Sequence, residues 1–597
     1  MLNFFVNFFL QTLAQYDIIF VYKGVVMRLQ INNSKSSQSL YVVKTVYFNK
    51  KKTNKVVEKL GTYDELKKKL DEYPIVWAKK YVEQLNKEIT KEQKDVLIAF
   101  NPSKLISKEQ PCSFNVGYLF LQKIYYELGL DIICKNISKK YKFEYDLNDI
   151  LSRLIYSRTI YPSSKLATFE LSKKFLETPR FELQHIYRSL EVLSKETDFI
   201  QSELYKNSLN ISSRNTDVLY YDCTNYFFEV EEESGLRQYG KSKEHRPNPI
   251  VQMGLFMDGN GIPLAFNISS GNTNEQITLT PLEEKILHDF NLSKFVVCTD
   301  AALSSYVNRK FNDKQCRFFI TTQSIKKLKK HLKEWALNPN GWRLDNTNKE
   351  YTLEEINSNY DDFKDKIFFK ERWINENNLE QKLIVTYSLK YKYYQQEIRN
   401  SQIERAKDKL NSKSFKLDRY NQNDFKRFIR KTNITSDGEI AEKKVFSLNT
   451  EIIKNEEQFD GFYGVCTNLE KDVHEIIRIS KRRWEIKESF RILKSEFKTR
   501  PVYLSRDDRI TAHFTTCFLS LVILRFLEKR LDEKYTSHQI ITTLKEMNVL
   551  EKLEQGHIPL YTRTDLTDDL HDKFRFRTDY QIITDAKIKK ILKNTKK

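Results

Sequence analysis

The order of apolar segments after residue 213 is the feature that most constrains the fold of this chain. Three strand-like segments come first, and a helix, a strand, a helix and a strand then follow one another. The three segments are residues 218–222, 251–257 and 263–268, with the turn Gly259-Asn260-Gly261 between the last two. The later elements are a helix from Thr273 to about residue 290, a strand at 295–298, a helix at 301–310 and a strand at 317–321. This order predicts an α/β domain in which helices flank a mixed sheet.

Two aspartates stand near strand ends in this predicted sheet. Asp222 closes the first predicted strand, and Asp300 lies two residues beyond the fourth one. The order of elements is that of an RNase H-like sheet, in which these two strands are parallel neighbours and present both carboxylates at one edge. Carboxylates from distant parts of a chain bind Mg²⁺ or Mn²⁺, and two such ions about 4 Å apart support in-line phosphoryl transfer. Although a single aspartate at a strand end is more often a cap or turn residue, the pair predicts a metal site.

The composition of the chain favours a polyanionic partner. Lys and Arg number 100 against 80 Asp and Glu, which gives a net charge of +20, and an excess of this size attracts nucleic acid. A generic basic surface is the alternative. The seven cysteines show no C-x-x-C spacing and the nine histidines no zinc-ligand pattern, so we expect neither a disulfide framework nor a zinc site. A reducing, cytoplasmic setting is therefore expected.

A strongly basic helix is predicted at residues 482–500. Its apolar face consists of Ile486, Phe490, Leu493 and Phe497, and we expect this face to pack on the sheet. Beside it, an arc of about 80° carries the cations Arg483, Lys487, Arg491, Lys494 and Lys498. The loop before the second strand adds Lys243, His245 and Arg246. Such groups suit DNA phosphates, whereas a solvated helix face and a solvated turn remain the alternatives.

The remaining segments divide the chain into regions. Residues 1–26 form a possible upstream extension with neither a convincing signal peptide nor a membrane span, so Met27 is an alternative start. Residues 27–212 combine a β-hairpin with helices that serve either as a DNA-binding module or as a scaffold. The core is expected at 213–321 and 471–531, with an inserted β-containing domain at 322–470 and a helical region with a basic tail at 532–597. The apolar segment 510–526 is interpreted as a buried core helix rather than a membrane span.

Several separate blocks of the sequence resemble the DDE transposases of bacterial insertion sequences. These blocks are Tyr-Tyr-Asp-Cys-Thr-Asn-Tyr-Phe-Phe-Glu (220–229), Tyr-Gly-Lys-Ser-Lys-Glu-His-Arg-Pro (239–247), Gly-Ile-Pro-Leu-Ala-Phe (261–266), Gly-Asn-Thr-Asn-Glu (271–275), Thr-Asp-Ala-Ala-Leu-Ser-Ser (299–305) and Arg-Trp-Glu-Ile-Lys-Glu-Ser-Phe-Arg-Ile-Leu-Lys (483–494). The nearest branch has a β-rich insertion before its last core helix, which carries a Tyr, Arg, Glu, Lys signature. The resemblance implies an RNase H-like core that uses Mg²⁺ or Mn²⁺ to cut the terminal inverted repeats of its own element. It also implies double-stranded DNA as partner, a homodimer in the DNA complex and no membrane.

The resemblance assigns roles to particular residues and departs from the pattern at two of them. Asp222 and Asp300 match the first two catalytic aspartates, Arg483 the signature arginine and Lys494 its lysine. The tyrosine position holds Ser480.

The glutamate position, four residues after Arg483, holds Lys487. Glu488 is the candidate third catalytic residue and metal ligand, although a regular helix rotates it by about 100° from that position. Either a local distortion of the helix brings Glu488 to the ions, or this chain is an impaired transposase that only binds DNA. A general nuclease is a third interpretation.

Overall fold

The computed structural model describes residues 27–597 except 35–36, 49–50, 71, 92–101, 104, 107, 315, 346, 412–423, 435–439 and 553–555. The predicted extension at 1–26 therefore lies outside the described residues. The chain divides into two compact units. The first runs to Pro111 and includes Lys552–Gly556, and the second comprises Cys112–Glu551 and His557–Lys597.

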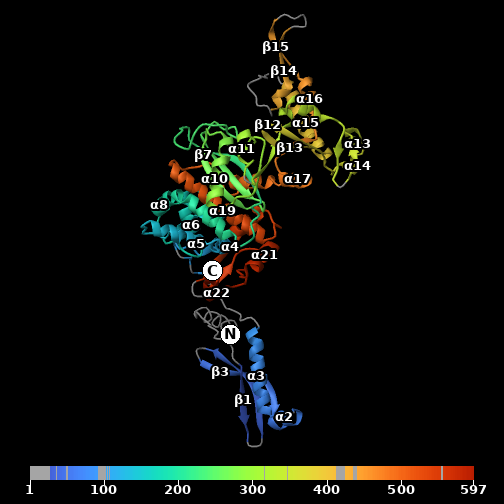
Figure 1. The fold of residues 1–597 in the computed structure, drawn as a ribbon. Helices are drawn as coiled ribbons and strands as arrows, with labels where there is room; N and C mark the ends of the chain where they lie inside the picture. Colours follow the sequence, from blue (N-terminus) through green and yellow to red (C-terminus); the bar gives the residue numbers. More distant parts are fainter. Residues whose placement is uncertain are drawn as a thin grey trace. The chain divides into compact units, whose positions relative to one another are not determined.

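The first unit is a small antiparallel sheet with two helices (Figure 1). Its elements are β1 (Met27–Asn33), β2 (Gln38–Phe48), β3 (Lys51–Thr62), α2 (Tyr63–Lys69) and α3 (Pro74–Lys91). Helix α2 begins with a capping box, in which Thr62 accepts from the backbone N–H of Glu65 and the Glu65 carboxylate accepts from that of Thr62. Leu40, Leu66 and Ala78 form its buried centre.

The second unit is built on a ten-stranded mixed sheet with the order β11-β10-β12-β13-β16-β9-β8-β5-β6-β7. The strands predicted from the sequence are β5 (Val218–Phe227), β6 (Ile250–Asp258), β7 (Pro263–Ser270), β8 (Val296–Thr299) and β9 (Phe318–Gln323). Strands β5, β6 and β7 pair antiparallel, whereas β8 pairs parallel with both β5 and β9. This is the strand order of an RNase H-like sheet, so the predicted fold class is confirmed.

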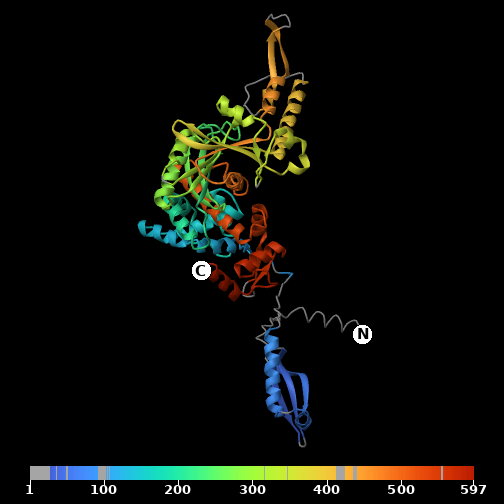
Figure 2. The ribbon, with the colours of Figure 1, turned by 45° about the vertical axis from the view of Figure 1, so that its right-hand side comes forward.

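The segment after β9 lengthens the same sheet (Figure 2). Its strands in the sheet are β10 (Trp342–Arg343), β11 (Glu350–Tyr351), β12 (Phe368–Glu376), β13 (Leu379–Tyr387) and β16 (Phe462–Thr467). Its other elements are α12 (Lys330–Leu337), α13 (Leu353–Ser358), α14 (Tyr360–Phe363), α15 (Leu389–Leu410), β14 (Ile429–Ile434), β15 (Ile440–Leu448) and α16 (Thr450–Glu457). Arg399 on α15 is bound by Asp460 just before β16, at 2.7 and 2.5 Å, and this buried pair fixes α15 to the sheet.

The helices between residues 112 and 212 share the hydrophobic core of the sheet. They are α4 (Tyr118–Glu127), α5 (Leu130–Lys140), α6 (Leu147–Ile160), α7 (Lys165–Ser172), α8 (Leu183–Lys195) and α9 (Thr197–Ser208). Helices α4, α6 and α8 pack around α19 (Asp507–Arg530). Among the described residues, α19 is the one helix long and apolar enough to cross a membrane, but 89% of its apolar window is buried in the protein. It is a core helix, as its sequence indicated.

The other elements cover the sheet or close the chain. They are α10 (Leu279–Asp289), α11 (Tyr306–Phe311), α17 (Val473–Lys481), α18 (Trp484–Ser495), α20 (Ser537–Glu546), α21 (Asp565–Phe574) and α22 (Asp585–Asn594), with the small strands β4 (Ser113–Asn115), β17 (Asn548–Lys552) and β18 (Gly556–Pro559). Helix α18 contacts β5 through its buried face. The domain boundaries inferred from sequence remain predictions.

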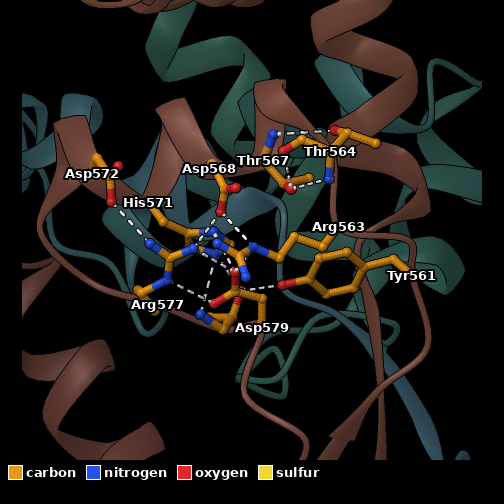
Figure 3. Close-up of polar contacts among 10 residues, drawn as sticks. Tyr561, Arg563, Thr564, Thr567, Asp568, His571, Asp572, Arg577 and Asp579 are labelled. Atoms are coloured by element: carbon orange, nitrogen blue, oxygen red, sulfur yellow. Dashed lines mark hydrogen bonds and ion pairs between the residues drawn. The ribbon is translucent and has the colours of Figure 1, made fainter.

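A charged cluster ties α21 to the residues that follow it (Figure 3). Arg577 donates to Asp572 at 2.9 Å and to Asp579 at 2.7 Å, and it also pairs with Asp568. The hydrogen bond to Asp579 raises the pKa of Arg577 above its ordinary value. Because these charges neutralise one another, we interpret the cluster as a clamp on the C-terminal region.

Candidate active site on strands β5 and β8

The parallel pairing of β5 and β8 brings the two predicted aspartates together. The register joins Val218 to Val296 and Tyr220 to Cys298, and its continuation by two residues places Asp222 beside Asp300. Neighbouring strands lie about 4.8 Å apart. The charge of Asp300 accordingly acts on the carboxyl group of Asp222.

Strand β5 is longer than its sequence pattern predicted. It continues to Phe227 through antiparallel pairing with β6, in which Asp222 faces Leu255 and Phe227 faces Ile250. The pairing of β8 with β5 ends earlier, at Cys298, and its pairing with β9 ends at Thr299. Asp222 therefore lies within β5, and it is the end of β8 that opens space beside it.

Each aspartate uses one carboxylate oxygen to fix its own position. Asp222 Oδ1 accepts from the backbone N–H of Cys223 at 2.8 Å. Asp300 Oδ1 accepts from those of Ala302 at 2.9 Å and Leu303 at 3.2 Å. Within the described part of the chain, the Oδ2 atoms accept no hydrogen bond. One oxygen of each side chain thus remains for a ligand.

Burial and repulsion make the ionised form of Asp222 costly. Burial, followed by the charge of Asp300, raises the pKa of Asp222 to about 6. The charges of Lys243 and Lys487 and the N–H of Cys223 lower this pKa in part. A carboxylate with raised pKa beside a second one is typical of a cation-binding site before the cation is bound.

Three lysines surround the two carboxylates. Lys243 donates to the carbonyl oxygen of Cys223, and Lys487 and Lys494 reach from α18. Burial, followed by the charge of Lys243, lowers the pKa of Lys494 to about 8, whereas Asp222 raises it. The lysine that matches the family signature therefore lies beside the catalytic aspartate that the resemblance assigns.

Glu488 forms an ion pair with Arg491 on the same helix. Its carboxylate accepts from Arg491 Nη2 at 2.6 Å and Nε at 2.8 Å, and the hydrogen bond to Arg491 lowers the pKa of Glu488. The charge of Lys487, the residue before it, acts on Asp222. Helix α18 is α-helical from Trp484 to Ser495, so Glu488 keeps the rotation of about 100° from position 487 that a regular helix imposes. Its role as third metal ligand stays a prediction.

Arg483 binds the protein itself. Its guanidinium donates to Thr299 O at 2.7 Å, to Thr322 Oγ1 at 2.6 Å and to Tyr463 Oη at 3.1 Å. These groups belong to β8, β9 and β16, and Thr299 directly precedes Asp300. Arg483 thus positions the strand end that carries Asp300, which is a different task from the DNA contact predicted for it.

The other predicted DNA-binding residues differ in their surroundings. Arg491 is exposed and pairs with Glu488. Lys498 lies beyond the end of α18, with φ of 44°, so it does not continue the helical arc. His245 is exposed in its loop, and the Arg246 guanidinium lies 4.1 Å from the centre of the Phe227 ring. Because α18 ends at Ser495, the basic helix predicted to reach residue 500 is shorter than expected.

Two glutamates near the site had no assigned part in the sequence interpretation. Glu275, in the Gly-Asn-Thr-Asn-Glu block, pairs with Lys243 at 3.0 Å. Glu244 binds Lys494 at 3.4 Å and also pairs with Arg500. In the same block, Asn274 caps a short 3₁₀ turn at Glu275–Ile277. The acidic residue that ends the block 271–275, Glu275, was the sequence signal for a contact with the site.

The residues around Asp222 and Asp300 provide some, but not all, of the features of a divalent-ion site. Two carboxylates on neighbouring strands, each with a free oxygen, are suitable hard ligands. Over the described ranges, however, no group of three His, Cys, Asp or Glu side chains stands close enough to hold a metal ion. The charge of Lys487 on α18 acts on Asp222, and it opposes a bound cation.

The sequence was compared with protein families, curated proteins and solved structures. Residues 227–523 match the family model of the transposase DDE domain. The matched range contains Asp300, Arg483 and Lys487, and it begins after Asp222. No curated protein matches the sequence. Among solved structures, the chain is similar to the cryo-EM structure of a piggyBac transposase synaptic complex with hairpin DNA, with 8% identity and a TM-score of 0.35 over 80% of this chain and 85% of that chain.

Proposed function

Because residues 227–523 match the family model of the transposase DDE domain, a domain of phosphoryl-transfer enzymes, we propose that the chain is the transposase of an insertion sequence. It binds the terminal inverted repeats of its element, cuts DNA strands there and joins them to a target. The observation that supports this proposal best is the register of β5 and β8, whose continuation places Asp222 beside Asp300, with the charges of three lysines acting on Asp222 or influenced by it.

The reaction is phosphoryl transfer between oxygen atoms. Water attacks the phosphorus atom at the end of the element, and the bond from phosphorus to the 3′ oxygen breaks, which releases a 3′-OH. That hydroxyl then attacks a phosphodiester of the target, and the displaced 3′ oxygen leaves. Enzymes with this domain use divalent metal ions, and Mg²⁺ or Mn²⁺ would activate the attacking oxygen and stabilise the leaving one.

The protein groups have separate tasks in this reaction. Asp222 and Asp300 would hold the ions through their free oxygens. Lys243 and Lys494 place positive charge where the phosphate enters, and Arg483 keeps the end of β8 in position.

A second candidate function is binding of the element ends without cleavage. The observation that favours it is Lys487, whose positive charge acts on Asp222 from the helix position where the family signature has glutamate. An ammonium group there repels a cation instead of ligating it. Such a chain would occupy the ends and inhibit active copies.

The variant Lys487→Glu distinguishes the two candidates. Cleavage of a duplex that carries the element ends is measured with Mg²⁺ and with EDTA, and a duplex of scrambled sequence is the substrate control. Lys481→Glu on α17 makes the same change of charge and is the protein control. Mg²⁺-dependent cleavage that appears only in Lys487→Glu identifies the unaltered chain as an end-binding protein.

Other outcomes reject parts of the proposal. Equal cleavage by the unaltered chain and Lys487→Glu would mean that the third ligand is not at position 487. Cutting of both duplexes alike would indicate a general nuclease. If neither protein binds the end-bearing duplex, the transposase proposal fails.

The proposal includes a homodimer on DNA and a location in the bacterial cytoplasm, at the nucleoid when DNA is bound. All seven cysteines are free thiols, which suits a reducing compartment. Inverted repeats around the gene, bounded by short direct duplications, would support a mobile element.

A further inference from the structure

A cavity of about 450 Å³ lies between the helical region and the segment that follows α18. Its basic lining residues are Arg158, Lys165, Lys498 and Arg500. His513 also lines it, and burial holds the pKa of this imidazole well below its ordinary value. Among the residues that the structure describes, no Asp or Glu lines this cavity. Tyr187 and Tyr503 add aromatic surface, and Tyr503 is exposed. Such a lining is suited to an anion.

Two of these cations are buried without a negative partner. Arg158 is 5% exposed and donates only to the carbonyl oxygens of Phe497 and Ser163, at 3.0 and 3.1 Å, and its Nε has no partner. Lys165 is also 5% exposed and forms no hydrogen bond or ion pair with any described residue. Buried charges are costly unless they are paired, so this pair of cations calls for an anion in the cavity.

The local fold adds to the attraction for an anion. Lys165 is the first residue of α7, and Ser164 caps that helix by accepting from the N–H of Ala167. A helix N-terminus favours negative charge. Burial, followed by the charge of Arg158, lowers the pKa of Lys165 to about 7, which is the response of an ammonium group that lacks a counter-ion.

The cavity is joined to the strand that carries Asp222. Val502, in the cavity wall, donates its N–H to Phe227 O at 3.2 Å, at the end of β5. Asp222 lies five residues earlier on that strand, a distance of roughly 17 Å along it. A DNA strand spans this distance in about five nucleotides.

Basic side chains connect the two places. Lys494 stands beside Asp222 and shares Glu244 with Arg500, which lines the cavity. Arg246 and Arg500 both lie against the ring of Phe227. Cations therefore follow the path from the carboxylates to the cavity, as expected along the route of a phosphate backbone.

We infer that this cavity, formed by Arg158, Lys165 and Lys498, binds a backbone phosphodiester of the DNA strand whose other end lies at Asp222 and Asp300. This inference rests on the proposed function, because it assigns a second contact to the same substrate. Free inorganic phosphate offers the same chemistry, but the line of basic residues toward Asp222 favours a strand.

The test is the salt dependence of DNA binding by the full chain. Affinity for a duplex carrying the element ends is measured in EDTA at several salt concentrations for the unaltered chain, Lys165→Met, Lys498→Met and Lys139→Met. Lys139 is exposed on α5 and away from the cavity lining, so it is the control of equal charge. Loss of one phosphate contact lowers the slope of log affinity against log salt by about 0.9.

The expected results distinguish phosphate binding by the cavity lysines from a purely structural role of these residues. Lys165→Met and Lys498→Met should each lower the slope, and Lys139→Met should leave it unchanged. Lys165→Met should also raise the Tm of the free protein, because it removes a buried unpaired charge. A lysine with only a structural role would lower the Tm and leave the slope as it was.

Three outcomes overturn different statements. An unchanged slope in Lys165→Met and Lys498→Met refutes the cavity contact while the proposed function stands. If inorganic phosphate raises the Tm of the unaltered chain but not of Lys165→Met, and the slopes are equal, the cavity binds a free anion and not a strand. If the unaltered chain shows no salt-dependent DNA binding, the proposed function itself fails.

Discussion

Replacing Asp222 by asparagine should stabilise the metal-free protein. In the folded chain the pKa of Asp222 is about 6, against an ordinary value of 3.8. Asparagine keeps an oxygen that accepts from the N–H of Cys223 and removes the charge. The repulsion from Asp300 disappears with it.

The size of the effect follows from the shift in pKa. A shift of about two units corresponds to about 3 kcal/mol at neutral pH. The folded state binds more protons than the unfolded state between about pH 4 and 6. The free energy of unfolding of the unaltered protein should therefore fall as the pH rises through this window and stay low above it. In Asp222→Asn this part of the pH dependence should be absent.

Urea denaturation in EDTA, at pH 4, 5, 6 and 7.5, measures this effect. Asp217→Asn is the control, because Asp217 is exposed just before the same strand. With Mg²⁺ added at about 1,000 times its Kd, the order should reverse, since an ion that binds only the folded state at this concentration adds about 4.1 kcal/mol and needs the carboxylate. If Asp222→Asn is no more stable than Asp217→Asn at pH 7.5 in EDTA, Asp222 does not share a buried site with Asp300.

Two further substitutions test the framework of the site. Arg483→Met should lower the free energy of unfolding by about 3 kcal/mol, because Thr299, Thr322 and Tyr463 lose their shared donor. The control Arg491→Met removes an exposed ion pair and should lower it by less than about 1 kcal/mol. Equal effects of the two variants in urea denaturation would contradict the role of Arg483. Asp258→Asn should cost about 3–5 kcal/mol, because it leaves the buried Arg214 guanidinium without its partner, and a loss under about 1 kcal/mol in the same assay would show that this pair is solvated.

Much of the central sheet could be predicted from sequence. Strands that are buried on both faces, such as β6, appear as continuous apolar runs, and Gly261, at φ of 81°, marks the turn into β7. Because β5 and β8 are parallel neighbours in this order, the proximity of Asp222 and Asp300 also followed from the element order. The end of α18 could not be predicted from sequence, because the residues from Glu496 onward still show the helical spacing of apolar and basic side chains.

Sequence by itself determined the order of the elements, the excess of positive charge and the presence of lysine at position 487. These properties depend on residue type and spacing, which a linear pattern contains. The tertiary structure alone decided that the helices before residue 212 share a core with α19, that the insertion extends the central sheet, and that Arg483 binds Thr299. It also brought Arg158 and Lys165 into the same cavity, where Arg158 donates to the carbonyl oxygen of Phe497. The physical reason is that periodicity shows which face of an element is buried, whereas the partner of that face comes from residues hundreds of positions away.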